Sequence, residues 1–251
     1  MPYGLYMSAE GAQAQSRRLE VIANNLANVN TIGFKPDVAA FQARFAESIQ
    51  QGDAAPGGRG IDDVGGGVKV IETLTNFAAG RLQRTGNESD LAIIGNGFFQ
   101  VAGDDGEALL TRAGAMRLDA EGRLLTANGH AVLDPGGAPI QLAPDVPWTV
   151  SKDGYVQQGE GAVPIALVEP ESLDELNKVG ANLFRPRGDV NPVAETAREV
   201  RSGFLEMSGA NPTRQMMAMI EASRAFEANA RLIQTQDSMI EGLVGRVLRA
   251  A

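Results

Sequence analysis

The chain has 251 residues, 43% of them hydrophobic and 21% charged, with a formal net charge of −9 at pH 7. This apolar content is enough for a packed core and excludes a disordered chain. Cysteine is absent, which excludes disulfides, thiolate metal sites and thiol nucleophiles. The first residues show no basic stretch ahead of an apolar one, and no apolar run reaches about 18 residues, so we expect neither a cleaved signal peptide nor a membrane span.

The first 27 residues carry a heptad pattern of small and apolar side chains, which predicts a helix of about 25 residues. Leu5, Leu19 and Leu26 are the only large members. Because a buried leucine contributes about 1.5–3 kcal/mol and ordering a residue costs about 1–2 kcal/mol, this helix needs partners. The predicted row consists of Leu5, Ala9, Ala12, Ser16, Leu19, Ala23 and Leu26.

The end of this helix is rich in asparagine, which is unfavourable in a helix interior. One interpretation is a simple helix end, in which Asn28 and Asn30 are capping residues and Gly33 provides a left-handed turn before Phe34. The other is that amides bind neighbouring helices and fix their register. The amides of that second interpretation belong to Asn24, Asn25 and Asn28.

The middle of the chain reads as a connector followed by a β-rich domain. Residues 51–67 are Gly-rich and suggest a flexible segment, and Val68–Leu74 alternates like a strand. Leu91–Val101 predicts a buried strand that is broken at Gly95 to Gly97. Short apolar runs separated by turns then predict an antiparallel sandwich or barrel, with one short helix at Pro170–Val179.

A second heptad helix of about 35 residues is predicted after Asn211 and Pro212, which suit the cap and the first turn. The simplest arrangement pairs the two terminal helices. The fold class is therefore α+β, with terminal helices paired as a coiled coil and an inserted antiparallel β domain. The second row consists of Met219, Ser223, Phe226, Ala230, Ile233, Asp237, Ile240, Val244 and Val247.

No constellation of an enzyme or a metal site emerges. The single histidine, His130, follows a hairpin turn and has no nucleophile elbow with it. The acidic cluster Asp104–Glu107 lacks the spacing of a calcium loop, and no Gly-rich stretch leads into a phosphate-binding helix. The whole excess of nine negative charges lies in residues 52–203, which disfavours nucleic acid and anionic membrane as partners. We expect no enzyme activity and no cofactor.

Three motifs resemble a known family. Asn24-Asn25-Leu26-Ala27-Asn28 followed by Thr31-x-Gly33-Phe34-Lys35 is similar to the signature of the flagellar rod and hook axial proteins. Gly95-x-Gly97-Phe98-Phe99 and Thr111-Arg112-x-Gly114 resemble the core of their β domain. Gly203-x-Leu205-Glu206 with Arg224-x-Phe226-Glu227 resembles their C-terminal signature. Size and Tyr6 make the chain most similar to the proximal rod branch, with the distal rod branch as the alternative.

The resemblance implies a structural subunit of the bacterial flagellar basal-body rod that polymerises helically through its terminal helices. It implies the periplasm-spanning rod as location, other rod proteins and copies of itself as partners, and export by the flagellar type III apparatus without a cleaved signal. A free-standing β-rich adhesin or binding module with coiled-coil ends is the alternative that the residues leave open.

The predicted division is a helical domain of residues 1–32 with 210–251, a connector of residues 33–80 and a β-rich outer domain of residues 81–209. The predicted assembly residues come from the helices and the turn. They are Leu5, Leu19, Asn24, Asn25, Leu26, Asn28, Gly33, Phe34, Met219, Phe226, Ile233 and Ile240.

Overall fold

The computed structural model describes residues 3–43, 67–103 and 105–250. The chain divides into two units. The described parts of 1–27, 37–75 and 211–251 form the helical unit, and those of 28–36 and 76–210 form the β unit. Nearly all of the predicted flexible segment, residues 51–67, lies outside the described residues.

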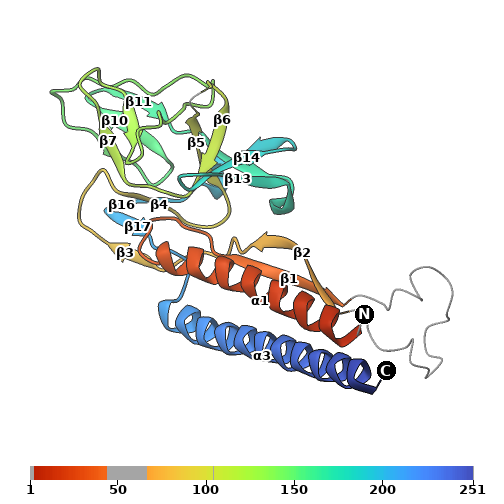
Figure 1. Cartoon of the computed structure of the whole chain (residues 1–251). Coiled ribbons are helices and arrows are strands. Elements are labelled where there is room, and N and C mark those ends of the chain that lie inside the picture. Colours follow the sequence, from red (N-terminus) through yellow and green to blue (C-terminus); the bar gives the residue numbers. More distant parts are fainter. Residues whose placement is uncertain (1–2, 44–66, 104, 251) are drawn as a thin grey trace. The chain divides into compact units, whose positions relative to one another are not determined.

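The helical unit contains two long helices and one β hairpin (Figure 1). Helix α1 (Tyr3–Ala27) contacts α3 (Pro212–Ala250) and also the antiparallel pair β1 (Asp37–Ala43) and β2 (Val68–Thr75). The predicted helices and the predicted β2 strand are confirmed. The predicted cap is confirmed as well, because the Asn211 side chain accepts a hydrogen bond from the Arg214 amide at 3.0 Å.

Small residues and amides make the contact between α1 and α3. A Cβ on Gly4 would lie 2.9 Å from Gln236 Nε2, and one on Gly11 would lie 3.1 Å from Asn229 Oδ1. The residue numbers fall on one helix as they rise on the other, so the helices are antiparallel. The predicted heptad rows are wrong as the internal seam, since Ala9, Ala23 and Asp237 are exposed. The row of buried and half-buried positions on α1 instead includes Ser8, Gly11, Gln15, Ile22 and Asn25.

The β unit is built from antiparallel strand pairs, as predicted. Its largest sheet has six strands in the order β13-β14-β6-β5-β12-β15. The strands are β3 (Leu82–Arg84), β4 (Leu91–Ile93), β5 (Phe98–Ala102), β6 (Ala108–Thr111), β7 (Met116–Leu118), β8 (Leu124–Thr126), β9 (Thr149–Val150), β10 (Tyr155–Gln158), β11 (Gly161–Pro164), β12 (Leu167–Pro170), β13 (Leu176–Gly180), β14 (Leu183–Pro186), β15 (Val190–Pro192), β16 (Val200–Ser202) and β17 (Phe204–Glu206).

The central sheet is buried on both faces because neighbouring residues on its strands enter different cores. Phe99 of β5 belongs to the larger core, and Phe98 to a smaller one with Leu110 and Phe184. Side chains alternate across a strand, so adjacent apolar residues can fill both cores. The predicted break at Gly95–Gly97 is confirmed between β4 and β5.

The predicted helix at Pro170–Val179 is wrong. A single 3₁₀ turn, η2 (Leu173–Glu175), lies between β12 and β13, and a second, η3 (Glu195–Ala197), follows β15. The Ser172 hydroxyl accepts a hydrogen bond from the Asp174 amide, which caps a short turn. Leu176 then pairs with Pro186 in the β13–β14 ladder, and this strand pairing ends the turn.

Candidate assembly site

Asn25 fastens the end of α1 to the start of β1. Its side-chain Nδ2 donates to the Asp37 carbonyl at 2.7 Å, and its Oδ1 accepts from the Asp37 amide at 2.9 Å. The residue is 2% exposed. Both polar atoms of this amide are thus bonded within the chain, where they fix the start of β1. Asn24 is exposed and Asn28 is half-buried.

Gly33 makes the turn that follows this helix end, as predicted. Its φ is +68°, a left-handed conformation that favours glycine. A Cβ at this position would also lie 2.6 Å from the carbonyl carbon of Arg112. The Gly33 amide donates to the Glu206 carbonyl at 2.7 Å, so the turn is held against β17.

The residues around Phe34 are held by β13 and by the turn that follows it. Asn182 Nδ2 donates to the Ile32 carbonyl at 2.8 Å, and the Lys178 ammonium donates to the Lys35 carbonyl. The same ammonium lies 4.8 Å from the centroid of the Phe34 ring, within cation–π range. Phe34, predicted as an assembly residue, is 6% exposed, so in this structure it belongs to the interior.

Three buried charged side chains meet in the β unit. Lys35 Nζ lies 2.7 Å from Glu206 Oε1, and Arg112 NH1 lies 3.4 Å from Glu206 Oε2. Exposure is 1% for Lys35, 2% for Glu206 and 6% for Arg112. We call Lys35, Arg112 and Glu206 the charge cluster.

Backbone groups complete the charge cluster. Glu206 Oε1 also accepts from the Gly80 amide at 2.7 Å, Lys35 donates to the Ala78 carbonyl, and Arg112 donates to the Gly95 carbonyl. Arg112 Nε is buried and has no hydrogen-bond partner among the described residues. Burial lowers the pKa of Lys35 and that of Arg112, and the Glu206 carboxylate opposes both shifts. Removing this carboxylate would therefore leave Lys35 and Arg112 without the buried anion that contacts both.

The sequence did not reveal the charge cluster. Lys35, Arg112 and Glu206 lie far apart in the chain, and each sits beside glycine or apolar residues in one of the quoted motifs. That setting was the available signal, because a charged residue among buried neighbours requires a partner.

The surface of α3 carries large apolar side chains away from α1. Phe226, predicted as an assembly residue, is 38% exposed, while Met219, Ile233 and Ile240 are half-buried. On α1, the predicted Leu5, Leu19 and Leu26 are half-buried. The exposed large apolar residues of α3 are Met216, Met217, Ile220, Phe226, Leu232, Met239, Leu243 and Val244.

Two long paired helices and a β unit with a well-packed core are the features of this fold. His130, the residue on which the sequence would have to build a hydrolase, is half-buried, and its amide donates to Thr126 Oγ1. The described helices are too short or too polar to cross a membrane.

Comparison with known proteins identifies the class. Residues 5–35 match the family described as flagella basal body rod protein, residues 92–158 the flagellar hook protein FlgE/F/G D1 domain, and residues 201–244 the flagellar basal body rod FlgEFG protein C-terminal family. Each matched range contains one member of the charge cluster.

Full-length relatives agree with the three matches. The chain is 34% identical over 249 residues to the flagellar basal-body rod protein FlgF of Caulobacter vibrioides, with 98% of each chain covered. It is 35% identical over 260 residues to FlgG of Bacillus subtilis, with 96% of this chain and 97% of the relative covered. FlgF of Mesorhizobium japonicum is 32% identical over 247 residues, with 97% of each chain covered. The chain therefore belongs to the flagellar basal-body rod protein family, and it is a structural, non-enzymatic subunit of that rod.

Proposed function

We propose that this rod subunit polymerises helically through α1 and α3, as part of the drive shaft between motor and hook. The observation that carries the proposal is the exposed apolar surface of α3. Soluble proteins seldom leave so many large apolar side chains on one helix, unless the helix packs against a partner. Other rod proteins and copies of this chain are the proposed partners, and each would cover part of that surface.

The proposed assembly residues fall into two groups. Leu5, Leu19, Leu26, Met219, Phe226, Ile233 and Ile240 would meet neighbouring helices, together with Asn24 and Asn28. Asn25, Gly33 and Phe34 would act from inside the chain by fixing the path from α1 into β1 and the β unit. In this proposal the chain has three parts. The helical part is residues 1–32 with 210–251, the connecting part is residues 33–80, and the outer part is residues 81–209.

We place the chain in the proximal, FlgF-type branch. Its alignments with FlgF span 249 and 247 positions and cover 97–98% of the chain, so they need few gaps. The alignment with FlgG of Bacillus subtilis spans 260 positions, more than the 251 residues of this chain, and therefore requires residues that the chain lacks. The percentage identities to FlgF and FlgG are nearly equal, and the choice of branch rests on the lengths of the alignments.

Export by the flagellar type III apparatus is part of the same proposal. A chain that passes through a narrow export channel must be unfolded during passage. The contact between α1 and α3 buries small side chains and amides, such as Gly11 against Asn229, so the helices can separate at low cost.

Two charge substitutions test the proposal. Leu26→Asp and Phe226→Asp each place a carboxylate where a neighbouring helix would pack, at a cost of several kcal/mol if the group is buried without a partner. We expect both variants to be lost from isolated basal bodies and to abolish motility. Leu173→Asp, at an exposed apolar residue of the β unit, is the matched control and should assemble normally.

Fluorescence of the single tryptophan, Trp148, checks that the variants still fold, because this side chain packs on the larger core of the β unit. Unchanged fluorescence together with lost assembly supports the proposal. Normal motility of the Leu26→Asp and Phe226→Asp strains would refute it.

A further inference from the structure

The outer side of α1 presents one continuous row of exposed residues. The steps between successive members are 3, 4, 4, 3, 4 and 3, so they share one face of the helix. This row is separate from the positions that meet α3, such as Gly4 and Gly11. The row, here called the α1 stripe, is Tyr6, Ala9, Gln13, Arg17, Glu20, Asn24 and Ala27.

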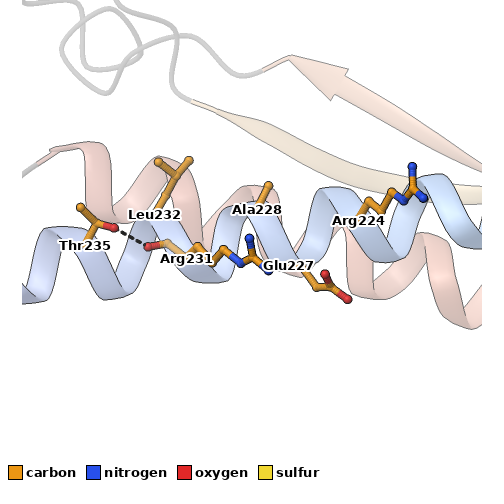
Figure 2. Close-up of a pocket in the computed structure, with 6 residues that line it drawn as sticks. All are labelled: Arg224, Glu227, Ala228, Arg231, Leu232 and Thr235. Atoms are coloured by element: carbon orange, nitrogen blue, oxygen red, sulfur yellow. Dashed lines mark hydrogen bonds between the residues drawn. The ribbon is translucent and has the colours of Figure 1, made fainter.

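Helix α3 carries an open groove on its own surface (Figure 2). Arg224, Glu227, Ala228 and Arg231 stand at i, i+3, i+4 and i+7, the spacing of a hole that accepts one side chain of a facing helix. A second hole follows one turn later. The groove is lined by Arg224, Glu227, Ala228, Arg231, Leu232 and Thr235.

The groove lies along an exposed row that matches the α1 stripe. Read from the C-terminal end, the steps of this row are again 3, 4, 4, 3, 4 and 3. Every member is exposed, so the row is open to a further helix. It consists of Ser238, Thr235, Arg231, Glu227, Arg224, Ile220 and Met217.

We propose that the α1 stripe of a second copy of this chain packs antiparallel into the α3 groove. In this register, the numbers of any two residues that face each other add up to 244. Tyr6 then lies opposite Ser238 and Ala27 opposite Met217. Within one chain the sums are lower, as in Gly4 with Gln236 and Arg18 with Glu221. The contact between copies is therefore distinct from the internal one. The inference rests on the proposed assembly through helices and specifies one of its contacts.

Charge favours this register over the register one turn away, at a sum of 241. At a sum of 244, Arg17 faces Glu227 and Glu20 faces Arg224, so both pairs are attractive. A shift of one turn to a sum of 241 brings Arg17 opposite Arg224, and Glu20 opposite Glu221. Like charges that face each other across helices are unfavourable, and such repulsion specifies register in coiled coils. Arg17 and Glu20 already lie 2.8 Å apart on the exposed surface of α1, so the partner's charges would extend an existing pair into a network.

The room beside Gly242 and the direction of the helices favour the same arrangement. Tyr6 would lie one turn from Gly242, where an added Cβ meets nothing within 4 Å, so the ring has room. In a polymer whose copies share one polarity, α1 of one copy runs antiparallel to α3 of the next, as it does within a copy. The parallel alternative would place Ala9 opposite Ile220 instead of Thr235.

Disulfide trapping in isolated basal bodies tests the register, and the chain has no cysteine of its own to interfere. The test variant is Ala9→Cys with Thr235→Cys, whose positions sum to 244. Ala9→Cys with Ile220→Cys is the control for parallel packing, and Ala9→Cys with Leu232→Cys is the control for a one-turn shift. Immunoblots of non-reducing gels then compare the yield of covalent multimers.

We expect multimers from the test variant at least fivefold above both controls. A higher yield from either control, or no multimer from any variant that is present in the basal bodies, overturns the inference and leaves the proposed function standing. If the unsubstituted chain itself were absent from basal bodies, the proposed function would fail as well.

Charge reversal covers the case in which the cysteine variants do not assemble. Arg17→Glu should lower the amount of chain in basal bodies severalfold, and Glu227→Arg in the same chain should restore it. If Glu227→Arg does not restore the amount of chain, the inference is contradicted. The loss caused by Arg17→Glu would then not come from the contact with Glu227.

Discussion

Glu206 is the residue on which the charge cluster depends. It is the only anion among three buried charges, and it accepts hydrogen bonds from Lys35, Arg112 and the Gly80 amide. A buried ion pair is weak support for stability by itself, but breaking one leaves a charge that the interior cannot solvate. The three residues come from three distant segments, so the cluster favours one particular arrangement of the β unit.

Glu206→Gln keeps the shape of the side chain and removes its charge. We expect the free energy of unfolding of the β unit to fall by about 3–5 kcal/mol, since two cations remain buried. Urea titration followed by Trp148 fluorescence measures it. Glu199→Gln is the control, because its partner Arg201 is exposed and surface pairs contribute about 0–1 kcal/mol. Similar losses in the two variants would argue against the cluster's role.

Single-residue roles were predictable from sequence where local backbone geometry decides them. Gly33 and Asn211 fall into this group, because a left-handed turn and a helix cap have residue preferences of their own. The partners of Asn25 and Glu206 were not predictable, since they lie 12 or more residues away and depend on how the chain folds back.

At the scale of elements, the Asn25 amide joins α1 to β1. It occupies the amide and the carbonyl of Asp37, and Asp37 Oδ1 also accepts from the Thr75 hydroxyl at 2.8 Å. Helix, first strand and second strand thus meet at one residue, and this fixes where β1 begins. Their register follows from that point, with Asp37 opposite Thr75.

Asn25→Ala removes both hydrogen bonds between this amide and the Asp37 backbone, and a hydrogen bond typically contributes about 0.5–1.5 kcal/mol. We expect less of this variant than of the wild type in isolated basal bodies, and reduced swimming. Asn30→Ala, at an exposed position of the same stretch, should behave as the wild type does. Equal incorporation of the two variants would show that the bonds to Asp37 do not matter for assembly.

Helix existence and length were predictable, but the packed face was not. The heptad steps of the two terminal helices predicted α1 and α3 correctly. The internal seam instead uses Gly4, Gly11 and Asn229, because a close approach of backbones favours small residues over leucine. Strand pairing could not be derived from short apolar runs of similar strength. The 3₁₀ turn η2 was predicted as part of a longer helix because the residues after it form a strand only by pairing with distant residues such as Pro186.

At the scale of the whole molecule, the two units differ in how they are stabilised. The β unit has two apolar cores and a buried charge cluster, and its six-stranded sheet is covered on both faces. The helical unit joins two long helices where glycines meet amide side chains, and it leaves large apolar residues such as Leu232 and Leu243 exposed. Because the contact between the two helices buries little apolar area, it stabilises the pair only weakly. Neighbouring subunits in the rod would supply the rest of the stabilisation.

Amide hydrogen exchange on the isolated full-length chain tests this account most directly. Protection against exchange reports the free energy of local opening in each segment separately. We predict strong protection in β5, β6 and β14, and protection near zero along α1 and α3 until the chain is assembled. Strong protection of α1 and α3 in the isolated chain, equal to that of the central sheet, would contradict the claim that the terminal helices are completed by their neighbours in the rod.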